Sequence, residues 1–466
     1  MFFKQYYLGC LAHASYLIAS QGIGAVIDPQ RDVDQYLDDA RKEGIEIKYI
    51  LETHLHADFV SGHRELAEKT GAQIVFGKSA SYQHDHIKAQ DGYRITFGDI
   101  ELSFIETPGH TPESICIMAK DKSDESSPAI LFTGDTLFVG DVGRPDLVGS
   151  KGYSAEQMAA MMYESIHDKI LILPEETLVY PAHGAGSLCG KNLSTEKSST
   201  IGREKKFNYA LREMKKEDFV KLLTTDQPEV PAYFPIDVEL NRQGAQAVED
   251  ISMPEPISAE EVREYLKNGA AIIDLRDGKT YSEGHIKGSI NINLTGQFAS
   301  WAGTLIAIGT TVILVADSKK NVEEAVVRLA RIGIETVAGY LENGMKGWLE
   351  ADFPVNLTEV ISVDELSAKI QAGEKLQILD VRRPQEYFAG HAPHAINIPL
   401  AELKDRVEEI PNVPLAVICA SGYRSSIAIS LLVRAGRTNL MNIAGGTKAW
   451  INAGFQTEGK PATCVS

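Results

Sequence analysis

Residues 53–63, THLHADFVSGH, place the residue types of a metal site at short spacing. His54 and His56 are two positions apart and Asp58 follows two further on, so imidazole nitrogens and a carboxylate can meet at one ion. A histidine at the next position would complete the ligands of a second ion, but the chain has Phe59 there. The stretch predicts either a two-metal hydrolase that has lost a ligand or a one-metal enzyme with different chemistry.

Three more residues of the same types end predicted strands further along the chain. His110 ends IETPGH, Asp135 ends ILFTGD and His183 ends LVYPAH. Gly109 and Gly134 precede two of them and permit the tight turns that would aim these side chains into a common cleft. A lone histidine is usually a core or surface residue. Four histidines and two aspartates at strand-to-loop junctions argue against that ordinary explanation and predict a metal site.

A second group of reactive residues lies in CASGYRS, residues 419–425, between a strand LAVI and a helix SSIAISLLVRAG. Cys419 at a strand end, followed by a loop and a helix, would sit among backbone N–H groups that favour a thiolate and a bound anion. Arg424 adds a cation for sulfite, thiosulfate or a persulfide. The ordinary alternative for Cys419 is a buried small hydrophobe. The residues expected to bind substrate around it are Ser421, Gly422, Tyr423, Arg424 and Ser425.

The C-terminal half contains two copies of one small domain. Residues 272–293, IIDLRDGKTYSEGHIKGSININ, match residues 378–399, ILDVRRPQEYFAGHAPHAINIP. The first copy has Ala316 or Asp317 where the second has its cysteine, and no cysteine occurs between positions 189 and 419. The first copy therefore cannot be a thiol-based sulfurtransferase, and a structural or docking role is expected.

The elements that must position these residues alternate along the whole chain and predict an α/β fold. Each repeat shows continuous apolar strands between helices, which is typical of a parallel sheet covered on both faces. Residues 1–200 are richer in strands and predict a sandwich-like α/β domain, and residues 201–255 read as a connector packed on it. We expect three domains, at residues 1–255, 256–355 and 356–466.

The composition is that of an ordinary soluble globular protein, with 44% hydrophobic and 24% charged residues. A net charge of −18 argues against nucleic acid and anionic membranes as main partners. No apolar run approaches the 18 or so residues of a spanning helix. The N-terminus is a poor signal peptide, and five irregularly spaced cysteines give no disulfide framework, so we expect a cytoplasmic protein.

The metal-ligand motifs resemble the metallo-β-lactamase superfamily, whose pattern is HxHxDH followed by a distant His, Asp and His. The persulfide dioxygenase branch is similar over five stretches: LAHASYLI, ETHLHADFVSG, TPGHTPES, TGDTLFVGDVGRPDL and YPAHGAGS. The resemblance implies an αββα sandwich that binds one Fe(II) per chain through His54, His110 and Asp135. Residues 357–457 resemble a rhodanese domain, in which Cys419 would carry sulfur as a persulfide.

The same resemblance assigns the remaining candidates. His56, Asp58 and His183 would hydrogen-bond bound water or the ligands instead of binding a second metal. Arg144 matches an arginine near the thiol carrier, and its ordinary alternative is a salt bridge. Glutathione-using members carry an acidic residue and a tyrosine after PAH, where this chain has Gly184 and Ala185.

The function expected from these residues is a sulfide-detoxifying enzyme with two activities. Iron and O2 would oxidise a small-molecule persulfide of glutathione, coenzyme A or bacillithiol type to sulfite, and Cys419 would make or use thiosulfate. A homo-oligomer is expected. The alternatives are a thioester hydrolase of the glyoxalase II type and a non-catalytic sulfur carrier. Cys189 is either a buried structural thiol or a residue near the iron that carries sulfur temporarily.

Overall fold

A computed structural model describes the chain except residues 148–151, 192, 226, 228–229, 308 and 460–466. The described residues form two compact units, which we treat separately. The first contains Met1–Ser252 with Val327–Glu335, and the second contains Met253–Val326 with Thr336–Ser466. The three-domain division at positions 255/256 and 355/356 stays a prediction.

The first unit contains two six-stranded sheets. In one sheet the first three strands are antiparallel and the rest are parallel. In the other sheet only β10 and β13 pair in parallel. The strands of the first sheet, in spatial order, are β1 (Phe2–Leu8), β2 (His13–Ser20), β3 (Ile23–Ile27), β4 (Glu46–Leu51), β5 (Gln73–Gly77) and β6 (Ile87–Ala89). Those of the second are β14 (Ser199–Thr200), β13 (Leu178–Pro181), β10 (Ile130–Gly134), β9 (Ile115–Asp121), β8 (Ile100–Glu106) and β7 (Arg94–Phe97).

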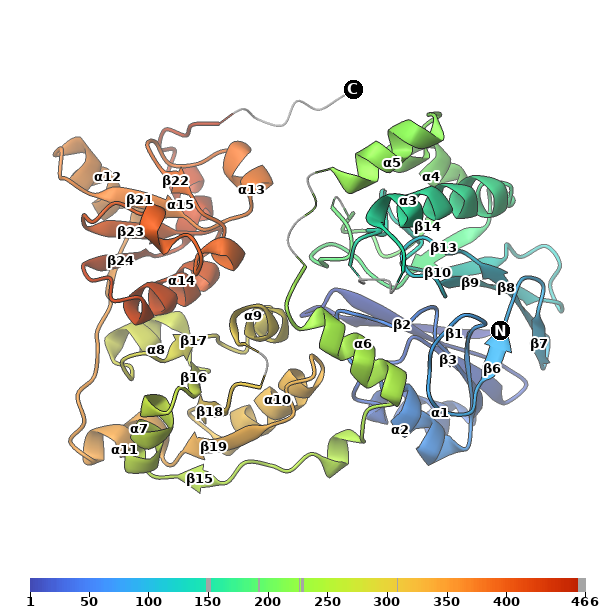
Figure 1. The fold of residues 1–466 in the computed structure, drawn as a ribbon, viewed down its shortest axis with the longest axis horizontal. Helices are drawn as coiled ribbons and strands as arrows, with labels where there is room; N and C mark the ends of the chain where they lie inside the picture. Colours follow the sequence, from blue (N-terminus) through green and yellow to red (C-terminus); the bar gives the residue numbers. More distant parts are fainter. Residues whose placement is uncertain (148–151, 192, 226, 228–229, 308, 460–466) are drawn as a thin grey trace. The chain divides into compact units, whose positions relative to one another are not determined.

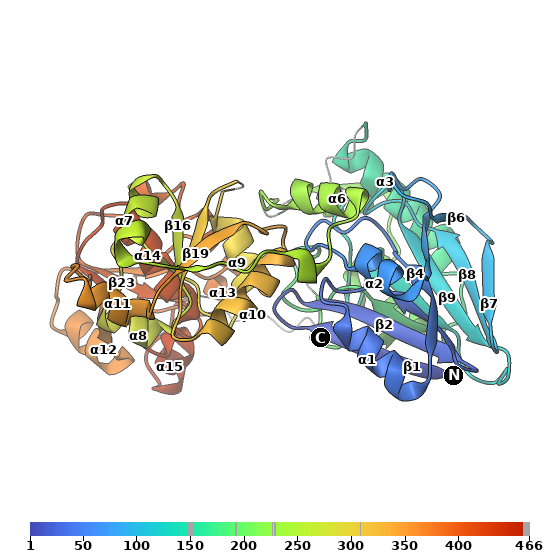
Figure 2. The same ribbon diagram turned by 90° about the horizontal axis from the view of Figure 1, so that it is seen from below.

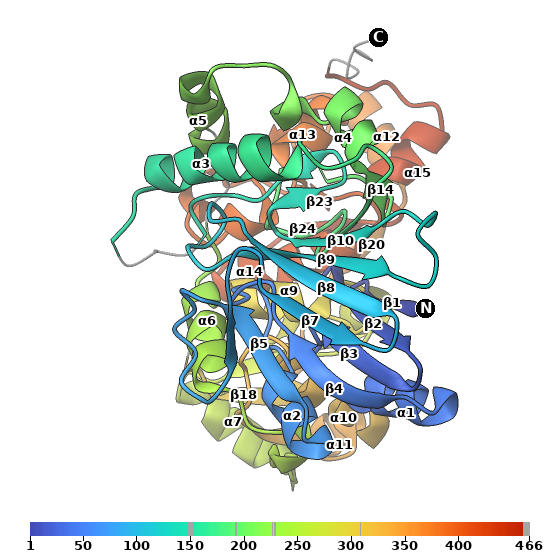
Figure 3. The ribbon, with the colours of Figure 1, turned by 90° about the vertical axis from the view of Figure 1, so that its right-hand side faces the viewer.

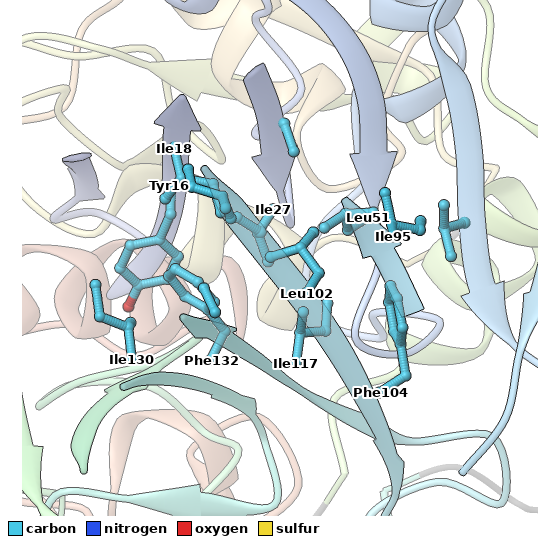
Figure 4. Close-up of a cluster of buried hydrophobic side chains, with 14 of the residues drawn as sticks. Tyr16, Ile18, Ile27, Leu51, Ile95, Leu102, Phe104, Ile117, Ile130 and Phe132 are labelled. Carbon is cyan, nitrogen blue, oxygen red and sulfur yellow. The ribbon is translucent and has the colours of Figure 1, made fainter. Parts of the chain in front are cut away.

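Apolar side chains from both sheets meet in a shared core. Tyr16 and Leu51 from the first sheet pack with Leu102, Ile117 and Phe132 from the second, and all five are buried (Figure 4). Their spacing follows the alternation of strand residues between two faces, so each sheet offers one apolar face to the other.

Helices cover the two outer faces of this sandwich. Tyr36 and Leu66 anchor α1 and α2 against the first sheet, and Met162 and Phe219 anchor α3 and α5 against the second (Figure 3). The order helix, sheet, sheet, helix confirms the expected αββα sandwich. The helices are α1 (Asp34–Glu43), α2 (His63–Thr70), α3 (Ala155–Glu164), α4 (Ile201–Phe207), α5 (Lys216–Thr224) and α6 (Phe234–Gln243). A short ribbon joins β11 (Leu137–Phe138) to β12 (Asp141–Val142).

The second unit repeats one parallel arrangement twice, each time with five strands flanked by helices (Figures 1 and 2). The first sheet orders β15 (Pro256–Ile257), β19 (Val337–Leu341), β18 (Val312–Val315), β16 (Ala271–Asp274) and β17 (Ile290–Asn291). The second orders β20 (Glu359–Ile361), β24 (Leu440–Ile443), β23 (Leu415–Ile418), β21 (Gln377–Asp380) and β22 (Ile396–Asn397). The pairings that join these strands are parallel, as the sequence predicts.

The two copies also have the same helix caps and the same arginine–aspartate ion pair. Ser258 and Ser362 each begin a helix with a capping box, which satisfies exposed N–H groups at the helix start. Arg276 pairs with Asp274 in the first copy, and the equivalent arginine and aspartate pair in the second. The helices are α7 (Ala259–Lys267), α8 (Gly278–Glu283), α9 (Phe298–Leu305), α10 (Lys319–Ala330), α11 (Gly344–Glu350), α12 (Val363–Gln371), α13 (Pro384–Phe388), α14 (Tyr423–Arg434) and α15 (Gly446–Asn452). Among the described residues, no helix is both long and apolar enough to cross a membrane.

Candidate functional site

Three predicted ligands converge inside the first unit. His54 follows β4, His110 follows β8 and Asp135 follows β10, and the ligand atoms of these buried residues lie within 4.8 Å of one another. Asp135 Oδ2 is 3.5 Å from His110 Nε2 and 3.9 Å from His54 Nε2. Within the described part of the chain this oxygen has no hydrogen-bond partner. A buried carboxylate oxygen facing two imidazoles fits a metal ion, because the ion would satisfy all three.

Hydrogen bonds fix the orientation of both histidines. His110 Nδ1 donates to the carbonyl of Arg144 at 2.9 Å. Thr53 Oγ1 donates to Asp28 Oδ2 and can therefore accept a hydrogen bond from His54 Nδ1 at 3.0 Å. Both rings then carry their proton on Nδ1 and keep the lone pair on Nε2, which is the tautomer that a metal ligand needs.

His183 links this set to Asp58. Its Nδ1 lies 2.7 Å from Asp135 Oδ1, and its Nε2 lies 2.9 Å from Asp58 Oδ2. Burial lowers the pKa of His183, but Asp135 and Asp58 outweigh burial and raise the pKa to about 10. Of the two predicted supporting residues, His183 therefore contacts the ligand Asp135 directly, and Asp58 acts on it only through His183.

His56 turns to a different set of partners. Its Nε2 lies 3.2 Å from Asp28 and 3.2 Å from Glu52, both buried. Burial lowers the pKa of His56, and the two carboxylates more than offset this and raise it well above its usual value. The His56 ring packs against that of His54, with 4.1 Å between the ring centres, and Asp28 also holds Thr53 behind His54.

Phe59 fills the position where the superfamily pattern has a histidine. Its side chain is buried, and its ring centre lies 4.0 Å from that of His13 and 4.4 Å from that of His56. An apolar ring packed against these two imidazoles supplies no ligand atom.

Arg144 is buried and already engaged. Its guanidinium holds Asp146 through two hydrogen bonds, of 3.1 and 2.9 Å, and donates to the carbonyl of Leu188. The contact with Asp146 is the salt bridge that the sequence analysis gave as the ordinary alternative for Arg144. Binding of a thiol carrier by Arg144 remains a prediction.

Cys189 lies beside the metal set. Its Sγ is grouped within 4.8 Å of ligand atoms of Asp58 and His183, and the three residues are buried. Burial, followed by the charges of Asp58 and Asp135, raises the pKa of the Cys189 thiol well above its usual value. The sequence raised this thiol as a candidate but gave no sign of its partners.

Two further residues hold the loop of residues 52–62, the metal-bearing loop, although the sequence gave neither of them a role; Glu113 lies within the TPGHTPES stretch, and Asn241 lies in no motif. Asn241 on α6 donates to the carbonyls of His56 and Phe59 and accepts from the N–H of Ser61. Glu113 accepts from the N–H of Leu55. The sequence pointed to α6 in one way only: the helix lies in residues 201–255, the connector that we expected to pack on the first domain.

Cys419 lies directly after β23, with its side chain buried. The Gly422 N–H donates to Sγ at 3.1 Å, and Ser425 Oγ lies 3.6 Å from Sγ. Ser425 is itself held by Asn442 at 2.7 Å. Gly422 has φ of 105°, a left-handed conformation that side-chain-bearing residues avoid, which explains glycine in the loop. The loop thus presents a backbone donor to the sulfur, as expected.

The other loop residues face different partners. Arg424 holds Glu386 through two hydrogen bonds of 2.7 Å each. Tyr423 Oη donates to the carbonyl of Asn293. Ser421 is exposed. Substrate contacts of these residues stay predictions.

Comparison with known proteins identifies both parts of the chain. A profile of the metallo-beta-lactamase superfamily matches residues 8–183, and a profile of the rhodanese-like domain matches residues 258–351 and 362–453. The mitochondrial persulfide dioxygenase ETHE1 of Bos taurus is 33% identical over 201 residues, which cover 42% of this chain and 70% of the relative. The chain belongs to the metallo-β-lactamase superfamily. It carries two rhodanese-like domains after the superfamily domain.

Other members of the superfamily differ in their named activities. The cytoplasmic hydroxyacylglutathione hydrolase of Arabidopsis thaliana is 34% identical over 185 residues, covering 39% of this chain and 67% of the relative. A solved metallo-beta-lactamase from Staphylococcus aureus subsp. aureus COL is 36% identical with a TM-score of 0.65, covering 73% of this chain and 98% of its own. Membership of the superfamily therefore does not show whether this chain catalyses an oxidation or a hydrolysis. The residues of the site have to distinguish the two reactions.

Proposed function

We propose that the protein is an Fe(II)- and O2-dependent persulfide dioxygenase with a sulfurtransferase activity at Cys419. The observation that carries the proposal is the ligand set of two imidazoles and one carboxylate, with Phe59 removing the histidine of the superfamily pattern. The bovine relative named as a persulfide dioxygenase supports the same choice.

His54, His110 and Asp135 would hold one Fe(II) per chain. When bound in such a set, Fe(II) offers open positions and the redox capacity that lets O2 react with a sulfur compound, which zinc lacks. Asp135 keeps its charge because His183 donates to Oδ1, leaving Oδ2 for the ion. Burial of the set excludes bulk water from the reacting sulfur.

The first reaction would be RSSH + O2 + H2O → RSH + SO3²⁻ + 2H⁺, in which the outer sulfur is oxidised and O2 is reduced. The thiol carrier would be of glutathione, coenzyme A or bacillithiol type. Gly184 and Ala185 stand where glutathione-using members have an acidic residue and a tyrosine, so the two non-glutathione carriers fit the chain better.

The second reaction would pass through Cys419. Its thiol takes the outer sulfur from RSSH, giving RSH and a persulfide on Cys419, and sulfite then removes that sulfur as thiosulfate. The N–H of Gly422 lies 3.1 Å from Sγ and can stabilise the thiolate that leaves. The reverse direction would use thiosulfate to supply persulfide to the iron. The first rhodanese-like domain has Ala316 directly after β18 and offers no thiol for either direction.

Metal analysis of anaerobically purified protein, combined with O2 uptake on the three persulfides, tests the first activity. We expect about one iron per chain and uptake matched by sulfite. Stoichiometric zinc with hydrolysis of a glutathione thioester and no O2 uptake would establish the glyoxalase II alternative instead.

Cys419→Ser tests whether the two activities are separate. Thiosulfate formation should stop while O2 uptake persists, because the residue supplies no ligand to the metal set. Loss of both in equal measure would show that the activities share one site. Cys10→Ser is the matched control and should leave both activities unchanged, since this cysteine belongs to neither set.

A further inference from the structure

The loop that carries Cys419 in the second rhodanese-like copy is contacted by residues of the first copy. Tyr423 and Ser426, at the start of α14, bond to β17 and to the loop after it, and both copies belong to the second compact unit (Figure 1). The first copy has Ala316 directly after β18 and no thiol of its own. Its own chemistry therefore does not explain why these contacts lie beside Cys419.

A chain of hydrogen bonds runs from the first copy to the Cys419 sulfur. Ser426 Oγ donates to Asn291 Oδ1 at 2.6 Å, and both side chains are buried. The N–H of Ser426 donates to the carbonyl of Gly422 at 3.2 Å. The N–H of Gly422 in turn donates to Cys419 Sγ at 3.1 Å. Asn291 therefore reaches the sulfur through Ser426 and Gly422, and helps to fix the backbone donor that Cys419 receives.

Asn291 is a rigid support because its amide nitrogen is already held within its own copy. Nδ2 donates to two backbone carbonyls of the first copy, at 3.1 and 2.8 Å. Asn397 makes the same pair of bonds inside the second copy, at 2.8 and 2.9 Å. The repeat thus keeps one structural amide in both copies, and the first copy also uses its amide oxygen to hold Ser426 of the second.

A second support lies against the Tyr423 ring. Tyr423 Oη donates to the carbonyl of Asn293 at 3.3 Å. Gly296 comes so close to the ring that a Cβ at this position would lie 2.5 to 2.8 Å from three ring atoms. A side chain at position 296 would therefore displace the ring or its own loop. Because Tyr423 directly follows Gly422, displacement of the ring would reach the N–H that faces Cys419.

We propose that the first rhodanese-like copy positions the sulfur-carrying loop of the second, with Asn291 and Gly296 as its positioning residues. The proposal deepens the sulfurtransferase activity proposed for Cys419 and rests on it. The two supports fix the first turn of α14, so the Gly422 N–H stays aimed at Sγ while sulfur is gained and lost. A donor held in place before the reaction stabilises a thiolate better than a mobile one, because it costs no reordering during the reaction. The first copy thus has a function although it carries no cysteine.

The pH profile of Cys419 alkylation tests this positioning without requiring turnover. The full chain would be treated with iodoacetamide at a series of pH values, and the rate at Cys419 would be followed by mass spectrometry of its peptide. Ser426→Ala breaks the bond to Asn291, so the profile should move up by about half a pH unit, equivalent to about threefold less thiolate at neutral pH. Arg424, whose charge interacts with Cys419, should keep its pairing with Glu386 in this variant. Partial unfolding would change the amount of reacting protein but would not produce this shift of the folded chain's profile.

Ser430→Ala is the matched control. This buried serine lies one turn further along α14 and also bonds Asn291, since its Oγ accepts the Asn291 N–H at 3.3 Å. It lies beyond the first turn of the helix, so its loss should weaken the packing of the two copies and leave the alkylation profile unchanged.

Gly296→Ala tests the support under the ring and covers the case in which Ser426→Ala fails to fold. It should move the profile in the same direction as Ser426→Ala, because the added methyl group displaces Tyr423. In a Tyr423→Ala background it should add nothing, since the ring that it displaces is gone.

Sulfur transfer from thiosulfate to cyanide, which gives sulfite and thiocyanate, links the profile to activity. Ser426→Ala and Gly296→Ala should each lower kcat/KM at pH 7 by about threefold or more, whereas Ser430→Ala should not. Unchanged profiles in both Ser426→Ala and Gly296→Ala, or an equal shift in Ser430→Ala, would overturn the positioning role. A wild-type chain that forms no thiocyanate would overturn the sulfurtransferase proposal instead, and the alkylation profiles would still decide the positioning.

Discussion

Replacing Asn241 with alanine should destabilise the first unit and release its metal, because one side chain holds three backbone groups of the metal-bearing loop. Nδ2 donates to the carbonyls of His56 and Phe59, each at 2.8 Å, and Oδ1 accepts from the N–H of Ser61 at 2.7 Å. The side chain is 1% exposed, so bulk water does not reach these groups. His54 and Asp58 belong to the same loop and should lose their fixed geometry with it.

The size of the effect follows from the three orphaned groups. Each buried backbone group left without a partner costs about 1–3 kcal/mol. A water molecule can enter the space vacated by the amide and satisfy part of the deficit, so the total should be about 3–5 kcal/mol. For a unit of this size, 1 kcal/mol shifts the unfolding midpoint by about 2–4 °C, which predicts a fall of about 10 °C.

The positions of the tryptophans make the assay specific. Trp301, Trp348 and Trp450 are the only tryptophans of the chain, and all three lie in the second unit. Tryptophan emission therefore follows the second unit, while scanning calorimetry follows both. We expect Asn241→Ala to lower the calorimetric transition of the first unit and its metal content, with the emission midpoint unchanged.

Asn208→Ala is the matched control. This buried asparagine also makes three hydrogen bonds, through Nδ2 to Asp141 O and Glu204 Oε2 and through Oδ1 to the N–H of Ala210. It holds no group of the metal-bearing loop, so its loss should lower the midpoint similarly and spare the metal. Equal metal loss in both variants, or a shift below about 2 °C for Asn241→Ala, would refute the reasoning.

Three further changes test other parts of the structure. Gly134→Ala places a methyl group about 2.5 Å from Thr53 Oγ1 at a φ of +52°, so it should cost about 2 kcal/mol or more and lower metal content by elemental analysis. Ser425→Ala removes a hydroxyl 3.6 Å from Cys419 Sγ and should slow sulfur transfer about tenfold, measured as thiosulfate formation. Burial lowers the pKa of His285 to about 4, so the unfolded state gains the proton first as pH falls. Tryptophan emission should show stability lost between about pH 6.5 and 4, and less so in His285→Gln.

Much of the site could be predicted because its ligands follow short apolar strands that are recognisable in the sequence. Asp135 comes directly after β10, and His54 and His110 lie in the loops that follow β4 and β8, so all three are placed by strand ends that gather along one edge of the sheets. The duplicated rhodanese-like domains were predicted because residues 272–293 match residues 378–399, and the structure adds that each copy has its own helix cap and ion pair. Ser258 and Ser362 act on residues three positions away, so the pattern is complete within one short segment.

What the sequence could not give depends on contacts between distant segments. The spacing of His54 and His56 suggests that both rings face one ion, yet the buried carboxylates of Asp28 and Glu52, directly after β3 and β4, pair with His56 instead. Asn241 reaches the loop from 182 positions further along the chain and belongs to no periodic pattern. Such polar partners are chosen by the need to satisfy buried backbone groups, which becomes visible only when the segments are packed.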